Sequence, residues 1–422
     1  MKLKSFRQVK RMTVSLDMQG DVRVLGQLAW RAGEHRAYFE YSPELQAKPL
    51  LVSPFHLPVR AGAQPANTQP FEGLHGLFND SLPDGWGRLL LDRRMQKAGF
   101  DHHALTPLDR LAAVGNKGMG ALSYVPDIED DRKEGEPRDL DWFAEEIEKT
   151  QKQISTAEID VLQGAQGGSA GARPKIMIGL RRADEMVVPD YGQGFDASYE
   201  QWMVKFPGGG DPQEIGAEEY AYALMAQAAG IEMAETRLIE TSRKNRFFAT
   251  KRFDRSGHGR RHVHTASGLL NADHRMASLS YEHLHRLTAM MTREHPQVLT
   301  MFGRMAFNVY ARNRDDHAKN HAFLMDSAGS WRLAPAYDLT FSSGPGGEHN
   351  ASIGGEGRNP TDQHMLTVAK GASIAASDAR AELGKVRSAV DQWPIFAEEA
   401  GLSTGRAREL DQILNGGRGR KP

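Results

Sequence analysis

RNRDDHAKN at residues 312–320, with Asp338 further along, is the stretch that decides the fold. Phosphoryl transfer needs an acid near the acceptor hydroxyl, and an amide and a second carboxylate to hold magnesium on the phosphates. Protein kinases place the acidic residue five positions before an Asn, and a metal-binding Asp follows on a nearby hairpin. Asp315 and Asn320 have that offset, and two apolar runs before Asp338, HAFLMD and WRLAPAYD, are expected to pair as strands. The spacing predicts a kinase-type site; a solvated polar helix end is the alternative for the Asp–Asn pair alone.

The sequence upstream offers groups for the phosphates of a nucleotide. Such a site needs backbone amides around the phosphates and a cation on them. Residues 167–171 read GGSAG, and Arg173 and Lys175 follow directly. The segment has neither the G-x4-G-K-[ST] nor the G-x-G-x-x-G pattern, so a surface loop is its alternative.

Lys205 lies in the apolar run WMVKFP, whose neighbours predict a buried strand. An unpaired ammonium is costly to bury, so we expect anionic partners for it. A phosphate and a glutamate of the helix predicted over 215–229, either Glu218 or Glu219, would form the strand-lysine and helix-glutamate pair of kinases. A lysine at a sheet edge with its ammonium in water is the alternative.

Composition limits the class of protein. The 422 residues predict two to three domains with a large core. The chain has no cysteine, which excludes disulfides, thiolate zinc sites and a Cys nucleophile. Its 53 Lys and Arg balance 54 Asp and Glu, which excludes a chain-wide basic surface for nucleic acid. No apolar run is long enough for a signal peptide or a membrane span, so we expect a soluble cytoplasmic protein with no membrane partner.

The chain divides by pattern into four parts. Residues 11–60 alternate apolar and polar positions, which is typical of antiparallel strands, and helical patterns follow to about 125. Residues 127–160 are rich in charge and predict a linker followed by a helix. A β-rich part with a hairpin over 237–255 then precedes mostly helical patterns. We expect domain boundaries at 1–126, 127–160, 161–256 and 257–422.

Together these pieces resemble the HipA kinases, the toxin half of bacterial HipA/HipB toxin–antitoxin modules. The resemblance runs from about residue 74 to 340 in family order and is most specific over 313–340. The matching segments are SLPDGWGR (81–88), GMGAL (118–122), GARPK (171–175), VKFP (204–207), AEEYAYALMAQAAGI (217–231), KRFDR (251–255), NRDDHAKNHAFL (313–324) and LAPAYDLT (333–340).

The resemblance implies an α+β, two-lobed protein-kinase-like fold, distantly similar to phosphatidylinositol kinases, with a β-rich N-terminal subdomain and an all-helical C-lobe. It implies ATP and Mg²⁺ as cofactors. Asp315 would be the catalytic Asp, Asn320 and Asp338 the magnesium ligands, and Lys205 the lysine that contacts phosphate. The implied nucleotide contacts are Ala170, Gly171, Ala172, Arg173, Pro174, Lys175, Lys205, the adenine-reading hinge Lys251, Arg252 and Phe253, and His317, Ala318, Lys319, Asn320, Tyr337 and Asp338.

The same resemblance implies a protein substrate with a Ser or Thr acceptor, the best-known target type being an aminoacyl-tRNA synthetase, and growth arrest as the outcome. It also implies a helix-turn-helix antitoxin dimer (HipB-like) as partner, which brings the kinase to operator DNA. An alternative of another class is a nucleotide-holding co-repressor that acts with the antitoxin and transfers little or no phosphate. The intact set of Lys205, Asp315, Asn320 and Asp338 argues for the kinase.

Two departures from the family pattern stand out. Self-inhibited members carry an autophosphorylated Ser three residues before the Gly of the G-A-x-x-K segment, where this chain has Gly168. Ser169, one position later, is the nearest candidate for autophosphorylation. The segment HVHTASGLLNADHR at 262–275 differs from the acidic and glutamine-rich segment of the best-known members, which leaves the subfamily, substrate and partner open.

A histidine cluster near residue 260 offers a competing metal site. His258, His262 and His264 lie close together in the sequence, with Asp254 nearby. Metal-binding histidines usually come with rigid spacing and further hydrogen-bond partners. The intervening Gly and Arg residues instead predict a solvated hairpin tip.

Overall fold

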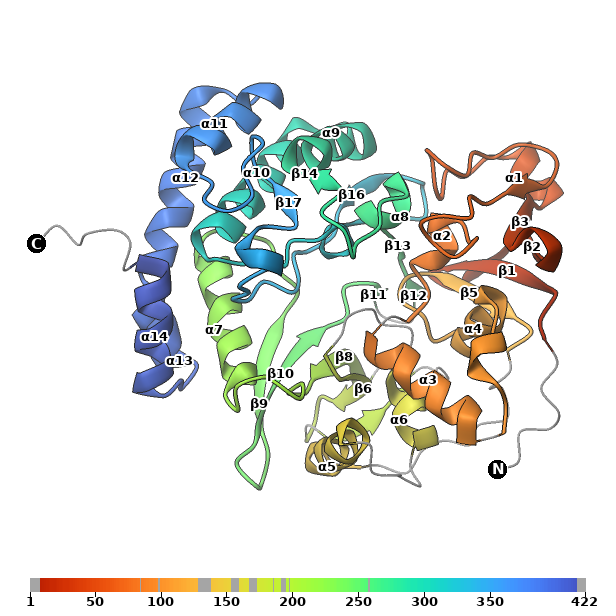
Figure 1. Ribbon diagram of the computed structural model, residues 1–422, viewed down its shortest axis with the longest axis horizontal. Coiled ribbons are helices and arrows are strands. Elements are labelled where there is room, and N and C mark those ends of the chain that lie inside the picture. Colours follow the sequence, from red (N-terminus) through yellow and green to blue (C-terminus); the bar gives the residue numbers. More distant parts are fainter. Residues whose placement is uncertain are drawn as a thin grey trace, which may run out of the picture.

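The computed structural model of the protein is shown in Figure 1. The residues that it describes are 8–83, 85–97, 99–127, 138–152, 159–166, 173–184, 186–190, 195–196, 198–256 and 259–415.

An antiparallel sheet forms the start of the chain. Alternate residues of β1, among them Met12, Val14 and Leu16, are buried, which is the period of a strand with one face on a core. The strand order is β4-β3-β2-β1-β5, so β5 returns to pair with β1 and closes this unit. The strands are β1 (Arg11–Met18), β2 (Asp21–Arg31), β3 (Arg36–Tyr41), β4 (Gln64–Pro65) and β5 (Leu122–Val125).

Short helices fill the loops of this N-terminal unit. α4 starts at a capping box, in which Thr106 and Asp109 bond to each other's backbone N–H. Trp86 and Leu90 of α3 pack into the core of the next sheet, so α3 joins the two units. The helices are α1 (Pro43–Ala47), α2 (Gly76–Asn79), α3 (Gly85–Lys97) and α4 (Pro107–Val114), with 3-10 turns at Ala32–Glu34 and His102–Ala104.

A second antiparallel sheet, in the order β7-β6-β8-β10-β9, forms the N-lobe of the kinase-like core. The hairpin predicted over 237–255 is confirmed as β9 and β10, and Lys175 of β6 lies opposite Lys205 of β8. Helix α7 lies along the sheet and stops before Gly230, whose φ is +75°. The elements are α5 (Leu140–Gln151), α6 (Ile159–Gln166), β6 (Lys175–Arg181), β7 (Val187–Pro189), β8 (Tyr199–Lys205), α7 (Ile215–Ala228), β9 (Thr236–Glu240) and β10 (Arg246–Lys251).

The C-lobe is mostly helical and is built around α10, which is buried along most of its length because it is apolar on several faces. It also holds two small sheets, β13-β15-β16 and β14-β17, so it is not all helical. β15 and β16 are the predicted strand pair before Asp338. The helices are α8 (Ala266–Leu270), α9 (Tyr281–Thr292), α10 (His295–Tyr310), α11 (Asp362–Gly371), α12 (Ala376–Val390), α13 (Trp393–Glu399) and α14 (Thr404–Asn415), with 3-10 turns at Ala318–Asn320 and Pro345–Gly347. The strands from Arg255 onward are β11 (Arg255–Ser256), β12 (Gly259–Arg260), β13 (His262–Thr265), β14 (Leu279–Ser280), β15 (Ala322–Met325), β16 (Trp331–Leu333) and β17 (Ala351–Ser352).

The expected solvated hairpin tip around His262 and His264 is wrong. Both histidines are buried in β13, which pairs with β15 and faces the N-terminal unit. His262 Nε2 lies 3.1 Å from the Val52 carbonyl oxygen, and His264 Nε2 lies 3.0 Å from Ser53 Oγ. The N-terminal unit therefore buries a segment whose local composition predicts exposure. His258 lies outside the described residues.

Asp80 anchors the N-terminal unit to the C-lobe. Its carboxylate lies 2.6 Å from His264 Nδ1 and accepts hydrogen bonds from Thr265 N and Thr265 Oγ1, each at 2.7 Å. Met325 of β15 also belongs to the core of the N-terminal unit. The unit is thus fixed by polar and apolar contacts.

Asp254 forms a second junction. It is fully buried between Arg252 and Arg255, and it accepts a hydrogen bond of 2.7 Å from Gly120 N. Arg255 in turn donates to the Gly118 carbonyl oxygen at 3.0 Å. These ion pairs explain Asp254 without a metal ion.

Among the described residues, none of the helices is both long enough and apolar enough to span a bilayer.

Candidate active site

A cavity of about 680 Å³ lies where the N-terminal unit, the N-lobe and the C-lobe meet. Most of the predicted nucleotide residues line it, although they are spread over more than 160 positions of the chain. The predicted residues on its wall are Arg173, Lys175, Lys205, Glu219, Lys251, Arg252, Phe253, Asp315, His317, Lys319, Asn320, Tyr337 and Asp338.

Two described residues of the predicted set, Pro174 and Ala318, are not on the wall. Both adjoin wall residues, and the Pro174 carbonyl oxygen accepts a hydrogen bond of 2.9 Å from Phe206 N. Ser169, Ala170, Gly171 and Ala172 lie outside the described residues, so their roles stay predictions.

Lys205 lies between two carboxylates at the floor of the cavity. Its Nζ is 2.8 Å from Glu219 Oε2 and also contacts Asp338 Oδ1. Burial alone would lower the pKa of Lys205, but the charges of Asp338 and Glu219 outweigh it and raise this pKa. The alternative of an edge lysine in water is therefore wrong, and Glu219 is the helix partner.

Two further cations surround this pair. Arg173 bonds to Glu219 at 2.6 Å and to Asp211 at 2.9 Å, and Lys175 lies opposite Lys205 in the sheet. Burial opposes ionisation of Asp338, but Lys205 and Lys175 together hold its pKa below the usual range. Asp338 is thus ionised at neutral pH, and the three cations make this end of the cavity suited to phosphate groups.

The loop after α10 brings Asp315 and Asn320 to the same cavity. Asn320 Nδ2 donates a 2.6 Å hydrogen bond to the Asp315 carbonyl oxygen, which holds the turn and leaves the amide oxygen as a potential ligand. Desolvation in the cavity raises the pKa of Asp315; His317 and Arg173 oppose this, and Asp338 and Asp316 add to it. A carboxylate with a raised pKa suits a group that takes a proton.

Asp316, which the sequence analysis did not assign, is the structural anchor of this loop. It is buried and accepts hydrogen bonds from Tyr281 Oη (3.0 Å), Asn350 N (2.8 Å) and Ala351 N (3.3 Å), and His349 Nδ1 lies 2.9 Å from it. Asp315 is left facing the cavity because its neighbour is held behind it. Sequence alone gives no signal for this role, since the partners lie more than 30 positions away.

Asp338 sits at a sharp turn of the backbone, with φ of +53°. Its carbonyl oxygen accepts a hydrogen bond of 3.3 Å from Asn313 Nδ2, and the preceding Tyr337 donates to the Lys319 carbonyl oxygen at 2.5 Å. A non-glycine residue in this region costs free energy, which the surrounding bonds offset. The turn aims the Asp338 carboxylate at Lys205.

Aromatic rings line the part of the cavity next to β10. The Phe253 and Tyr337 rings stack with centroids 5.6 Å apart. The Lys251 side chain bonds instead to Glu200 at 2.8 Å, and buried Arg252 bonds to Asp254. The backbone amides of Lys251 and Arg252 are also engaged, with the Glu235 carbonyl oxygen at 2.8 Å and the Gln201 carbonyl oxygen at 2.9 Å. The hinge role of 251–253 stays a prediction.

Two oxygen donors of the cavity fit a magnesium ion. The Asp338 carboxylate and the Asn320 amide oxygen are hard oxygen donors of the kind that Mg²⁺ prefers. Both residues line the same cavity from loops that pack on each other through Tyr337 and Lys319.

Two family models match the chain. The HipA N-terminal domain matches residues 16–125, and the HipA-like C-terminal domain matches residues 167–393, which is more than half of the chain. The chain belongs to the HipA family. The fold prediction is thereby confirmed, and the kinase-like lobes of this HipA-family protein correspond to the second of the two matched regions.

Curated relatives and solved structures also resemble this HipA-family protein. The putative kinase Y4mE of Sinorhizobium fredii is 25% identical over 378 residues, 82% of this chain and 77% of the relative. HipA of Shewanella oneidensis MR-1, solved in complex with HipB and its operator DNA, is 17% identical. The structural match covers 95% of this chain and 96% of the Shewanella HipA chain with a TM-score of 0.68, which shows the same fold.

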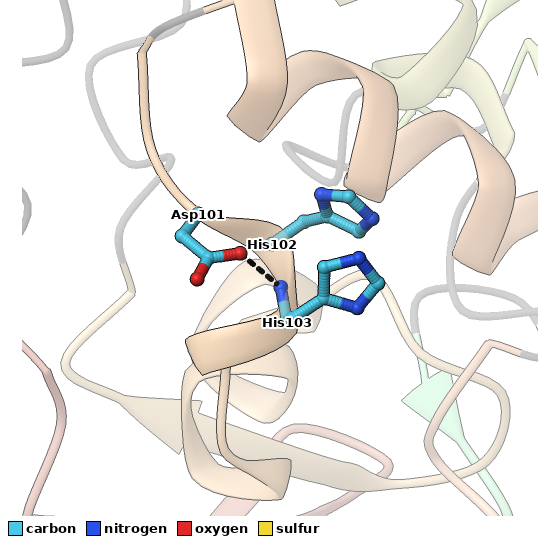
Figure 2. Close-up of side chains that lie close together, drawn as sticks. All are labelled: Asp101, His102 and His103. Carbon is cyan, nitrogen blue, oxygen red and sulfur yellow. Dashed lines mark hydrogen bonds between the residues drawn. The ribbon is translucent and has the colours of Figure 1, made fainter.

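A surface group of this HipA-family protein also brings together residues of the metal-ligating kind. Figure 2 shows Asp101, His102 and His103 close together at the start of a 3-10 turn. Their ligand atoms lie within 4.8 Å of one another. The two rings lie side by side with centroids 4.0 Å apart, and the Asp101 carboxylate accepts a 2.9 Å hydrogen bond from His103 N. Capping of the turn accounts for Asp101, and none of the three lines the cavity.

Proposed function

We propose that this HipA-family protein is an ATP- and magnesium-dependent serine/threonine protein kinase, and the toxin of a HipA/HipB-like pair. The observation that carries the proposal is Lys205, ion-paired to both Glu219 and Asp338 in the cavity that Asp315 and Asn320 also line. Active protein kinases pair a strand lysine with a helix glutamate and use a metal-binding aspartate in the same site.

Six polar groups of the cavity have a role in this proposal. Asp315 orients the acceptor hydroxyl and takes its proton, which the raised pKa of its carboxyl favours. Lys205, with Arg173 and Lys175 beside it, steadies the phosphates of ATP. Asn320 and Asp338 would hold magnesium, which neutralises charge on the phosphates when bound. Catalysis then consists mainly of positioning and charge neutralisation.

The acceptor enters, in this proposal, from the side of the cavity that the N-terminal unit covers. Glu72 and Arg88 of that unit and Asp273 and Arg275 of the C-lobe line this side. They form two ion pairs, the exposed Arg88–Glu72 at 2.9 Å and the half-buried Arg275–Asp273 at 2.9 Å. Such pairs cost little to break, so an incoming polypeptide can exchange with them.

The partner is proposed from the solved relative. HipA of Shewanella oneidensis was solved with HipB and its operator DNA. We infer a helix-turn-helix antitoxin as the partner of this chain and DNA contact through that antitoxin. Growth arrest would follow from phosphorylation of a protein target.

The test is transfer of labelled γ-phosphate from ATP by purified protein with magnesium and a cell lysate, followed by phosphoamino-acid analysis. Wild type is expected to label a protein on Ser or Thr, whereas Asp315→Asn and Asp338→Ala are not. Asp326→Asn, at an exposed turn, is the matched control and should behave as wild type. Equal labelling by wild type and Asp315→Asn would contradict the kinase proposal.

ATP binding, measured by calorimetry on the same samples, separates the kinase from the nucleotide-holding co-repressor. Asp315→Asn should still bind ATP, because Lys205, Arg173 and Lys175 remain. ATP binding by wild type without transfer to any protein would favour the co-repressor.

A further inference from the structure

The last two helices of the described chain pack on the helix that carries Glu219. Figure 1 shows α13 and α14, in dark blue, beside α7 of the N-lobe, and α13 and α7 are in contact. The ring centroids of Trp393 in α13 and Tyr222 in α7 lie 5.2 Å apart. The matched HipA-like domain ends at residue 393, so α14 comes after the matched region.

Arg406 of α14 makes the central contact. Its Nε and Nη2 lie 2.9 and 2.8 Å from Glu218 Oε2. The Glu218 side chain is 1% exposed, so it depends on this cation for compensation of its charge. Burial raises the pKa of Glu218 in spite of Arg406, which shows how far its carboxylate is removed from water.

A second contact holds the first turn of the same helix. Glu214, the N-cap residue of α7, accepts hydrogen bonds from Ser403 N at 2.8 Å and Ser403 Oγ at 2.6 Å. Arg246 of β10 donates to the Gly401 carbonyl oxygen at 2.8 Å. The loop before α14 thus ties α7 and the sheet together at one point.

The two contacts bear on the rotation of α7 about its axis, together with the packing of its buried face. Glu218 and Glu219 are consecutive, so their side chains leave the helix about 100° apart. Glu218 is held by Arg406, and Glu219 meets Lys205. A turn of the helix that released one glutamate would move the other, because the backbone between them is a single rigid turn.

We propose that Arg406 is a positioning residue for phosphoryl transfer: by holding Glu218 it sets the rotation of α7 at which Glu219 meets Lys205. The kinetic test of this inference rests on the proposed kinase function. The structural test, by hydrogen exchange, does not depend on that function.

The kinetic test compares kcat/KM for ATP among purified full-length variants. Arg406→Ala is expected to lower it by about 10- to 100-fold, the effect of a small misplacement of a catalytic group. Arg406→Lys, which keeps the charge, should recover most of the loss. Arg408→Ala, an exposed arginine on the same helix, is the matched control and should stay within about twofold of wild type.

A double-variant cycle distinguishes positioning from general destabilisation. If Arg406 acts through the Glu219–Lys205 pair, Arg406→Ala should lower activity by less than about twofold in a Glu219→Gln background. A loss in that background as large as the loss in wild type would overturn the proposal.

Hydrogen exchange supplies the test that needs no catalysis. Arg406→Ala should speed amide exchange in 215–228 while leaving 295–310 of α10 unchanged. Unchanged exchange in 215–228 would overturn the inference even if the kinase is active. Faster exchange there in a protein that transfers no phosphate would support the link between α14 and α7 while the proposed function fails.

Discussion

Asp315 shares its surroundings with two other carboxylates, and this sets the pH at which the site can work. Desolvation in the cavity, with Asp338 and Asp316 nearby, raises the pKa of Asp315 above that of an ordinary Asp, although His317 and Arg173 oppose the shift. Below that raised pKa the carboxyl is protonated and unable to take the acceptor proton. We therefore expect phosphate transfer to fall on acidification at a pH above about 3.9, the value for a free Asp.

The measurement is the single-turnover transfer rate at saturating ATP across a pH series, with circular dichroism on the same samples as a control for unfolding. A rate that stays constant down to the ordinary pKa of Asp, in protein that remains folded, would contradict this assignment of Asp315.

The neighbouring residues Asp315 and Asp316 offer a matched pair for separating chemistry from stability. Asp316→Ala leaves several buried donors without an acceptor, including Tyr281 Oη and Asn350 N. We expect the free energy of unfolding to fall by about 3 kcal/mol or more, at roughly 1–3 kcal/mol for each group left unpaired. Urea denaturation measures this change.

Asp315→Ala is the control, and it should show the reverse pattern. Asp315 faces the cavity, and from the described residues its carboxylate accepts one weak hydrogen bond, 3.5 Å from Asn350 Nδ2. We expect stability within about 1 kcal/mol of wild type and loss of phosphate transfer. Similar destabilisation by both substitutions would contradict the division of roles in this loop.

The residues of the site divide into those that spacing reveals and those that it does not. Asp315, Asn320 and Asp338 stand in a pattern that local sequence contains, and Lys205 is marked by a charge in an apolar strand. Asp316 lies in the same stretch, but its function depends on Tyr281 and residues 349–351. Their approach is a product of tertiary packing, which no short motif encodes.

At the scale of elements, the segment 252–255 joins β10 to the N-terminal unit through buried charge. Asp254 lies between Arg252 and Arg255, and these cations, against the effect of burial, hold its pKa well below the usual range. Asp254→Asn removes the charge that compensates both arginines. We expect the free energy of unfolding to fall by about 3–5 kcal/mol, as when one member of a buried ion pair is lost.

Glu240→Gln is the control, because Glu240 and Lys244 form an exposed pair at 2.8 Å in the β9–β10 turn. Loss of this pair should lower the free energy of unfolding by about 1 kcal/mol or less. The stability that Asp254 contributes should be present at neutral pH. It should fade as the pH falls below the pKa of an ordinary Asp, because the pKa of Asp254 is lower in the folded protein than in the unfolded chain. Equal losses in the two variants, measured by urea denaturation, would contradict the importance of this junction.

The sequence predicts elements whose pattern of apolar and polar residues is local. It does not predict the burial of elements that are covered by a distant part of the chain. The β9–β10 hairpin follows from two apolar runs around a polar turn, and the packing of its neighbours does not change that pattern. β13 shows the limit, because His262 is buried by Val52, 210 residues earlier in the chain. The charged and glycine residues near His262 in the sequence predict an exposed segment. Only the contact with the N-terminal unit, which local sequence does not encode, buries it.

At the scale of the whole molecule, the N-terminal unit and the kinase-like core should unfold together. Met325 of the C-lobe belongs to the core of the N-terminal unit, and Asp80 bonds to Thr265 and His264. We expect hydrogen exchange in 11–31 and 295–310 to reach the same midpoint in a urea series. Asp80→Ala should lower the midpoint for 11–31 below that for 295–310.

Asp21→Ala, at an exposed ion pair in the β1–β2 hairpin, is the matched control and should leave the two midpoints together. Two separate midpoints in wild type would contradict the tight docking of the unit. A common midpoint in Asp80→Ala would show that the remaining contacts, including the Asp254 junction and Met325, hold the unit without Asp80.

The Asp80 junction also has a consequence for the time course of synthesis. Asp80 and His264 are 184 residues apart, and Ser53 and His264 are 211 residues apart. At about 5–20 residues per second, a ribosome needs roughly 10–40 s to progress from the first partner to the second. During this interval the first sheet can already form from local pairs, but the face that later receives β13 and β15 has no partner. A nascent chain therefore carries an uncovered docking face for many seconds, and this is the stage at which chaperones have most to protect.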